Sequence, residues 1–115
     1  MSSGFQLDIE SAIAALPQPP AEQYTIVHRH GTLEVGLYAP RGVDDQTPHT
    51  RDEAYVVVKG TGEFVCGDTR KLFAPGEFLF VPAGMTHRFE RFTPNLTVWV
   101  IFYGPQGGEH VQENS

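Results

Sequence analysis

The sequence has 115 residues and a mass of 12.7 kDa, with a net charge of −6 from 8 basic and 14 acidic residues. This length favours one domain over residues 1–115. The acidic balance argues against a nucleic-acid partner, which would need a clustered positive face. No apolar run approaches the roughly 20 residues of a membrane-spanning helix, and the start lacks a signal-peptide pattern. We therefore expect a soluble, cytoplasmic protein with no nucleic-acid or membrane partner.

One short helix is predicted near the N-terminus. Proline residues follow it closely, at positions 17, 19 and 20, and end it. Residues 1–20 are thus expected to form a helix and a proline-rich linker. The apolar stripe that predicts the helix recurs at spacings of three and four residues and consists of Phe5, Ile9, Ala12, Ile13 and Leu16.

The region 24–103 is predicted to be all-β. Short runs rich in Val, Phe, Tyr and Thr alternate with glycine and proline turns, which is typical of a sandwich or small barrel. Residues 104–115, with Gly107 and Gly108, are expected to be a loose tail. The predicted strands are Tyr24–Arg29, Thr32–Tyr38, Ala54–Lys59, Glu63–Cys66, Arg70–Phe73, Glu77–Val81, Thr86–Phe92 and Leu96–Tyr103.

Two predicted strands are apolar on both faces. In Ala54–Lys59, Tyr55 and Val57 share one face while Val56 and Val58 share the other, and Leu96–Tyr103 shows the same pattern. A strand that is apolar on both faces is covered on both faces. We expect the outer face to be covered by the N-terminal helix or by a second subunit, and we predict a homodimer.

Two segments carry motifs with a definite spacing. In the first, His49 is followed by Glu53, and six residues then separate Glu53 from Gly60. In the second, Gly76, Pro82, Gly84 and His87 follow one another with five, one and two intervening residues. Both segments resemble the paired signatures of the cupin superfamily, and the resemblance covers roughly residues 32–103. The stretch 45–55 is similar to a group of small single-domain bacterial cupins with a conserved barrel.

The resemblance implies a double-stranded β-helix, which is a jelly-roll barrel, and a metal site. Cupins usually hold a divalent ion with three histidines and one glutamate. Here Thr47 stands in the place of the first histidine and Arg91 in the place of a family asparagine. The implied metal ligands are therefore His49, Glu53 and His87.

The residues support the same site on physical grounds. Strand parity places Glu53 on the face of Tyr55 and Val57, and His87 on the face of Phe89. Burying an unpartnered carboxylate costs several kcal/mol, so an inward Glu53 requires a cation or a strong donor. Two imidazoles and one carboxylate with open positions suit Fe(II), Mn, Co, Ni or Zn. The alternative is that these groups merely hydrogen-bond to one another.

Other residues are candidates with a plainer alternative. His28 and His30, a second histidine pair, are candidates for the missing ligand, but surface or core packing is the more common reason for such a pair. Arg51 and Arg91 are candidates to hold an anionic substrate, or are solvated rim residues. The pocket is expected to be lined by Tyr55, Val57, Phe78, Phe80 and Phe89, with Trp99 as a further candidate. Phe78 and Phe80 share a parity opposite to that of Leu79, so at most one of these two sets faces inward, and the sequence leaves open which one.

Cys66, the only cysteine, excludes an intramolecular disulfide and a zinc site of several thiolates. Two functions stay open. The first is a metal-dependent enzyme that acts on a small organic molecule by oxygenation or isomerisation. The second is a non-catalytic module that binds or senses a small molecule, with a structural or absent metal. Ligating histidines must be neutral, so metal occupancy is expected to fall below about pH 6.5.

Overall fold

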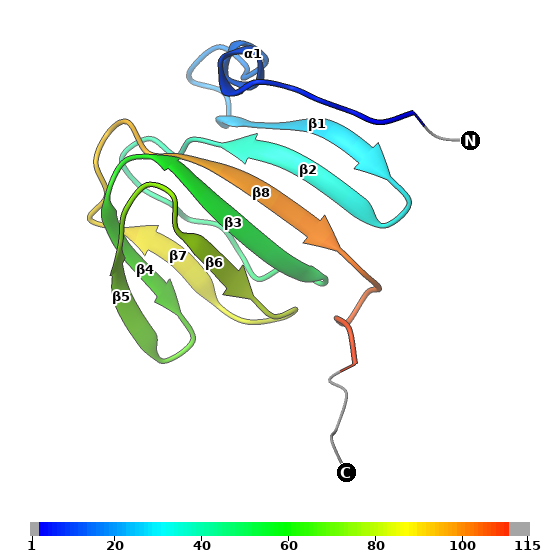
Figure 1. Cartoon of the computed structure of the whole chain (residues 1–115). Coiled ribbons are helices and arrows are strands. Elements are labelled where there is room, and N and C mark those ends of the chain that lie inside the picture. Colours follow the sequence, from blue (N-terminus) through cyan, green and yellow to red (C-terminus); the bar gives the residue numbers. More distant parts are fainter. Residues whose placement is uncertain (1–2, 111–115) are drawn as a thin grey trace.

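The structure, a computed structural model, describes residues 3–110, and its regular secondary structure is almost entirely β-strand. Eight strands appear where eight were predicted, with ends that shift by one or two residues (Figure 1). Within residues 3–110, no helix is long and apolar enough to cross a membrane. The strands are β1 (Tyr24–His30), β2 (Leu33–Tyr38), β3 (Asp52–Lys59), β4 (Gly62–Cys66), β5 (Thr69–Phe73), β6 (Phe78–Val81), β7 (His87–Glu90) and β8 (Thr97–Tyr103).

The strands form two antiparallel sheets, and the hydrogen-bonded ladder does not close into a full barrel. The larger sheet has the order β1-β2-β8-β3-β6 and the smaller sheet the order β5-β4-β7. In Figure 1 the smaller sheet lies beside the β3–β6 end of the larger sheet. The order of the strands matters for the site, because it places β3 beside β8 in one sheet and β7 at the edge of the other.

An aromatic core joins the two sheets. The Tyr55 ring on β3 packs edge-on against Phe64 on β4 and Phe89 on β7, at centroid distances of 5.8 and 5.1 Å. Phe73 on β5 packs against Phe89 in the same way, at 5.4 Å. Edge-to-face pairs at these distances add a favourable electrostatic contribution to the burial of apolar surface. The inward face predicted for Tyr55, Val57 and Phe89 is thereby confirmed.

The N-terminal helix is shorter than its apolar stripe predicted. Helix α1 spans Ile9–Ala14, and the Asp8 carboxylate caps it by accepting a hydrogen bond from the Ser11 amide at 2.7 Å. Phe5 therefore lies outside the helix, in an extended segment, where its ring stacks on His28 at a centroid distance of 4.2 Å. The prediction that Phe5 is a helix residue is wrong, because the Asp8 cap starts the helix after it.

The outer face of the larger sheet is only partly covered. Phe5 and Leu7 lie against a shallow apolar hollow on this face, and Trp99 and Ile101 contribute to it. Farther along the same face, on β6, Phe78 is 65% exposed and Phe80 is 45% exposed. The predicted homodimer stays a prediction.

Substitution of an exposed apolar residue tests that prediction. If a second copy covers the outer face, sedimentation at micromolar concentration should give the mass of two chains for the wild type and of one chain for Phe80→Lys, because a buried lysine lacks a partner. Leu72→Lys is the matched control, since Leu72 is 80% exposed on β5 of the other sheet. A single-chain mass for the wild type would contradict the dimer.

Two glycines test how tightly the turns are built. Gly60 and Gly76 both have positive φ, +96° and +89°, but a Cβ at Gly60 would lie 2.7 Å from the Leu96 Cα, whereas one at Gly76 meets nothing within 4 Å. Gly76→Ala should cost about 1 to 2 kcal/mol from the backbone conformation alone. Gly60→Ala should cost at least about 1 kcal/mol more, because neighbouring backbone must move. Urea denaturation measures both, and equal losses would contradict this account.

Candidate metal centre

The three residues of the predicted metal site come together from distant parts of the chain. Glu53 lies near the start of β3, His87 is the first residue of β7, and His49 lies in the 39–51 loop that connects β2 to β3. Their ligand atoms all lie within 4.8 Å of one another. Because β3 belongs to the larger sheet and β7 to the smaller one, the cluster sits where the two sheets face each other.

The carboxylate of Glu53 is buried and incompletely satisfied. Glu53 is 1% exposed and His87 is 2% exposed. The Glu53 Oε1 atom lies 3.1 Å from His87 Nε2 and 3.8 Å from His49 Nε2. Despite this proximity, Oε1 accepts no well-directed hydrogen bond within the described part of the chain. A buried carboxylate oxygen in this state costs free energy until a cation or a proton reaches it.

The ring of His87 is held so that its free nitrogen faces Glu53. Its Nδ1 lies 2.9 Å from the Met85 carbonyl oxygen, which can only accept, so Nδ1 carries a proton. In the neutral ring, Nε2 is then an unprotonated nitrogen that points toward Glu53. Burial lowers the pKa of His87, but the Glu53 carboxylate and the Met85 carbonyl outweigh it and hold that pKa above its ordinary value.

These donor atoms fit a divalent metal ion. Neighbouring ligands placed about 2.0–2.2 Å from one ion lie about 2.8–3.6 Å from one another in octahedral or tetrahedral arrangements. The separations of Glu53 Oε1 from the two imidazole nitrogens, 3.1 and 3.8 Å, are close to this range. An ion at their centre would satisfy the orphaned oxygen and both nitrogens at once. The hydrogen bond from His87 Nδ1 to the Met85 carbonyl oxygen is also a common support for an imidazole that binds a metal ion.

One residue of this centre, Gln46, was missed by sequence reasoning. Its Oε1 lies 3.1 Å from His87 Nε2 and 3.3 Å from His49 Nε2, and the Tyr55 hydroxyl donates to it at 3.1 Å. The signature spacing points to Thr47, which is exposed. The only signal in the sequence for Gln46 was its position next to Thr47. Because its amide side chain is long, Gln46 can reach the two histidines from one position before the residue that the signature spacing indicates.

The other candidate ligands lie elsewhere. His28 is on the outer face of the larger sheet beneath Phe5, and neither His28 nor His30 joins the ligand cluster of the described residues. Arg91 has a positive φ of 51° and contacts Glu63 at 3.3 Å on the surface. Arg91 is thus an exposed surface residue and is not among the described residues that line the pocket. His110 is also outside the cluster.

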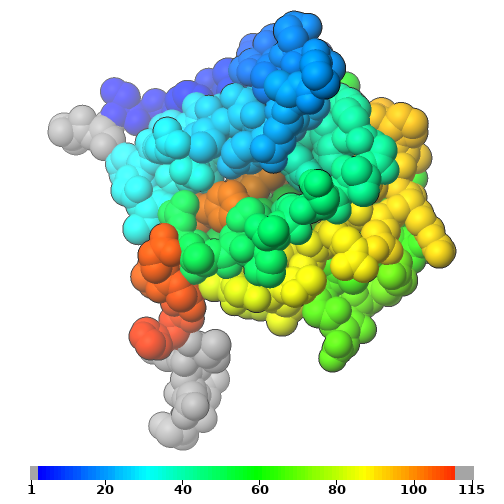
Figure 2. All heavy atoms as spheres, turned by 180° about the vertical axis from the view of Figure 1, so that it is seen from behind, coloured from blue at the N-terminus to red at the C-terminus, as the bar shows by residue number. Residues whose placement is uncertain are grey.

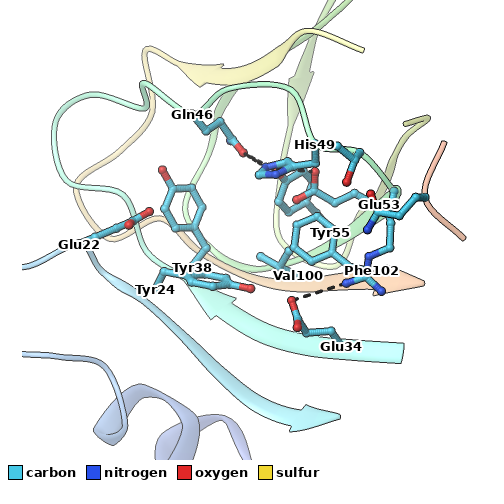
Figure 3. A pocket seen from close by; sticks show the side chains of 13 residues that line it. Glu22, Tyr24, Glu34, Tyr38, Gln46, His49, Glu53, Tyr55, Val100 and Phe102 are labelled. Carbon is cyan, nitrogen blue, oxygen red and sulfur yellow. Dashed lines mark hydrogen bonds and ion pairs between the residues drawn. The ribbon is translucent and has the colours of Figure 1, made fainter. Parts of the chain in front are cut away.

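A pocket opens directly from the metal centre. Its volume is about 380 Å³, at the lower end of the range for small-molecule sites. Figure 2 shows the hollow from behind, with β8 at its base between the β1–β2 hairpin and the 39–51 loop, and Figure 3 shows the side chains around it. The lining residues are Glu22, Tyr24, Glu34, Tyr38, Gln46, His49, Thr50, Arg51, Glu53, Tyr55, Val100, Phe102 and Gln106.

Most of the aromatic lining predicted from the sequence is wrong. Tyr55 does line the pocket, but Val57 and Phe89 belong to the closed core behind it. Phe78 and Phe80 are exposed on the opposite face, since the inward positions of β6 are those of Leu79 and Val81, which pair with Tyr55 and Glu53. Trp99 lies on the outer face, because Val98 and Val100 take the inward positions of β8.

Polar residues shape the mouth of the pocket. Arg51 donates to the Thr32 carbonyl at 2.6 Å and lies 3.8 Å from Glu34, so its guanidinium has partners within the protein. Burial, with Glu34 and Glu53 nearby, raises the pKa of Tyr24 to about 12. The Tyr24 hydroxyl therefore stays protonated and can donate a hydrogen bond to a bound molecule.

The segment 104–110 is anchored rather than loose. The Gly107 amide donates to the Thr50 carbonyl at 2.6 Å, and the Glu109 amide donates to the buried Asp52 carboxylate at 2.9 Å. These bonds place Gln106 in the pocket wall. Sequence reasoning missed them because they join residues more than fifty positions apart; the rest of the predicted tail, residues 111–115, lies outside the described residues.

Comparison with known proteins agrees with the fold described above. A family profile described as a cupin domain matches residues 34–103, which is more than half of the chain. The chain belongs to the cupin family. A relative, an uncharacterized protein of Streptomyces coelicolor, is 38% identical over 80 residues, covering 68% of this chain and 76% of the relative.

Solved structures show the same fold at low sequence identity. The protein TT1209 of Thermus thermophilus has a TM-score of 0.69 and 22% identity, covering 85% of this cupin and 95% of that chain. A protein of Shewanella frigidimarina with a cupin-2 domain has a TM-score of 0.65 and 16% identity, covering 85% and 94%. At these identities the structural similarity supports the fold and gives no information on the ligand or the reaction of this protein.

The raised pKa of His87 gives the centre a pH dependence. In the metal-free protein the ring holds its proton to a higher pH than the ordinary value of about 6.5, so this contribution to stability is present below about pH 6.5 and lost as the pH rises through the raised pKa. A metal ion must displace that proton. Affinity for Mn²⁺ should therefore weaken as the pH falls, starting above about pH 6.5. Calorimetric titration across this range would refute the expectation if the affinity stayed constant.

Proposed function

We propose that this cupin binds a divalent metal ion through His49, Glu53 and His87 and acts on a small organic molecule held in the adjoining pocket. The proposed reaction is an oxygenation or an isomerisation. The observation that carries the proposal is the buried, unsatisfied Glu53 Oε1, which faces two imidazole nitrogens at the floor of an open pocket. Replacement of a buried ion pair by apolar residues is often neutral or stabilising, so stability alone gives little reason for a carboxylate at this position.

Exposure differs among the three ligands in a way that suits catalysis. The side chains of Glu53 and His87 are 2% and 0% exposed, while that of His49 is 35% exposed and borders the pocket. A centre with a buried back and an open front leaves positions for water or substrate. A bound divalent ion would supply Lewis-acid or oxygen chemistry there.

The surrounding residues position a substrate and hold protons. Val100 and Phe102 offer an apolar floor, and Tyr24 offers a protonated hydroxyl. Burial, and then the Glu53 carboxylate, raise the pKa of Tyr55 well above its ordinary value, so its hydroxyl stays a donor to Gln46. We infer that the molecule bound in the pocket is small and partly apolar, with at least one group that accepts a hydrogen bond.

Removal of single ligands tests the metal site. Glu53→Gln and His87→Ala should lose most of the bound metal and most of the Mn²⁺ affinity, because each removes a buried ligand atom. His28→Ala is the matched control, since His28 lies on the outer face beneath Phe5. The measurements are elemental analysis of purified protein and calorimetric titration of metal-free protein. Full metal content in both ligand variants would refute the assignment.

A second experiment separates an enzyme from a binding module. A panel of small organic acids, alcohols and amides is screened for thermal stabilisation of the Mn²⁺-loaded and Fe²⁺-loaded protein, and each hit is followed by mass spectrometry. An enzyme should convert a hit, and Glu53→Gln should abolish the conversion. A hit that binds with equal affinity to the wild type and to Glu53→Gln, and stays unchanged, would favour the non-catalytic alternative.

A further inference from the structure

The amide of Gln46 is fixed in one orientation by a buried carboxylate. Gln46 Nε2 donates to Asp44 Oδ2 at 2.7 Å, and the same oxygen accepts the Phe89 amide at 2.8 Å. Asp44 Oδ1 accepts the Tyr38 hydroxyl at 2.6 Å. Since a carboxylate oxygen accepts hydrogen bonds, the amino group of Gln46 faces Asp44 and the carbonyl oxygen faces the other way.

The oxygen so oriented meets two imidazole nitrogens. Gln46 Oε1 lies 3.1 Å from His87 Nε2 and 3.3 Å from His49 Nε2. Because Met85 holds the proton of His87 on Nδ1, Nε2 of the neutral ring has no proton to give to Gln46. Glu53 Oε1 lies on the same nitrogen at 3.1 Å. When the His87 ring is neutral, two acceptor oxygens and an acceptor nitrogen therefore converge at one point.

We propose that Gln46 is the fourth metal ligand of this centre, through its side-chain carbonyl oxygen, and that Asp44 is the positioning residue that aims it. The inference rests on the proposed metal site and adds to it a neutral oxygen in the place of a third imidazole. The distances from Gln46 Oε1 to the two nitrogens, 3.1 and 3.3 Å, are those of neighbouring ligands on one ion. Tyr55 donates to the same oxygen at 3.1 Å and supports it from the core side.

This donor set has a chemical consequence. Two imidazole nitrogens and two oxygens form a harder set of ligands than three imidazoles and one carboxylate. Carbonyl and carboxylate oxygens suit Mn²⁺, while additional imidazole favours Zn²⁺, Ni²⁺ and Cu²⁺. The centre should therefore discriminate less strongly against Mn²⁺ than a site with a histidine at position 46 would.

The test compares three variants of the full chain in the metal-free form. Gln46→Ala should weaken Mn²⁺ binding by roughly tenfold or more, the scale of effect seen when a metal centre loses a supporting partner. Gln46→His should raise the ratio of Zn²⁺ affinity to Mn²⁺ affinity. Thr47→Ala is the matched control, because Thr47 is the exposed neighbour to which the signature spacing points, and its affinities should equal those of the wild type.

The outcomes separate this inference from the proposed function. Unchanged Mn²⁺ affinity in Gln46→Ala, together with its loss in His87→Ala, would overturn the role of Gln46 and leave the three-ligand site standing. Unchanged affinity in both variants would overturn both. Weakening by Thr47→Ala instead of Gln46→Ala would assign the fourth position to Thr47 and also refute the inference.

A measurement on the wild type covers the case in which a variant fails to fold. In protein labelled with ¹⁵N on glutamine, addition of Zn²⁺ should shift the side-chain amide signal of Gln46, because coordination through the oxygen draws electron density from the C–N bond. The signal of Gln18, which lies in the linker after α1, serves as the reference. A Gln46 signal that moves no more than the Gln18 signal would refute the inference.

Discussion

The burial of the Glu53 carboxylate is the constraint on which this cupin's site depends. An acidic side chain with almost no exposure is costly in a core of aromatic and aliphatic groups, and its Oε1 has no well-directed hydrogen bond in the described residues. Its neighbours on β3, Tyr55 and Val57, belong to the core. The fold thus buries one carboxylate, at a cost in free energy, among apolar residues whose burial is favourable. This carboxylate lies where the pocket meets the core.

The position of this group between the sheets gives it a second significance. Glu53 belongs to the larger sheet and His87 to the smaller one. The neighbouring side-chain atoms His49 Nε2 and Gln46 Oε1 come from the loop that precedes β3. Aromatic contacts hold the two sheets together on one side of the site. On the other side, Asp44 connects the loop to β7 through its bond to the Phe89 amide. The site is therefore held by aromatic packing on one side and by hydrogen bonds on another.

The sequence predicted the strands and the inward face of β3, because alternation along a strand is a local property. The convergence of His49, Glu53 and His87 was expected from the resemblance of their two segments to the cupin signatures. It did not predict Gln46, whose role depends on how Asp44 turns the amide. It left open whether Phe78 and Phe80 or Leu79 face inward, because parity alone cannot tell which face of β6 is inward. It also missed the anchoring of Gly107 and Glu109, which depends on Thr50 and Asp52 of a distant segment.

The extent of the family match gives the pocket wall a further meaning. The matched range, residues 34–103, contains all the proposed ligand atoms, yet Glu22 and Tyr24 precede it and Gln106 follows it. The proposed ligand residues thus lie within the matched range, while Glu22, Tyr24 and Gln106 of the pocket wall lie outside it. A substitution at one of these three positions would therefore change the wall that a bound molecule meets while leaving the proposed metal ligands in place.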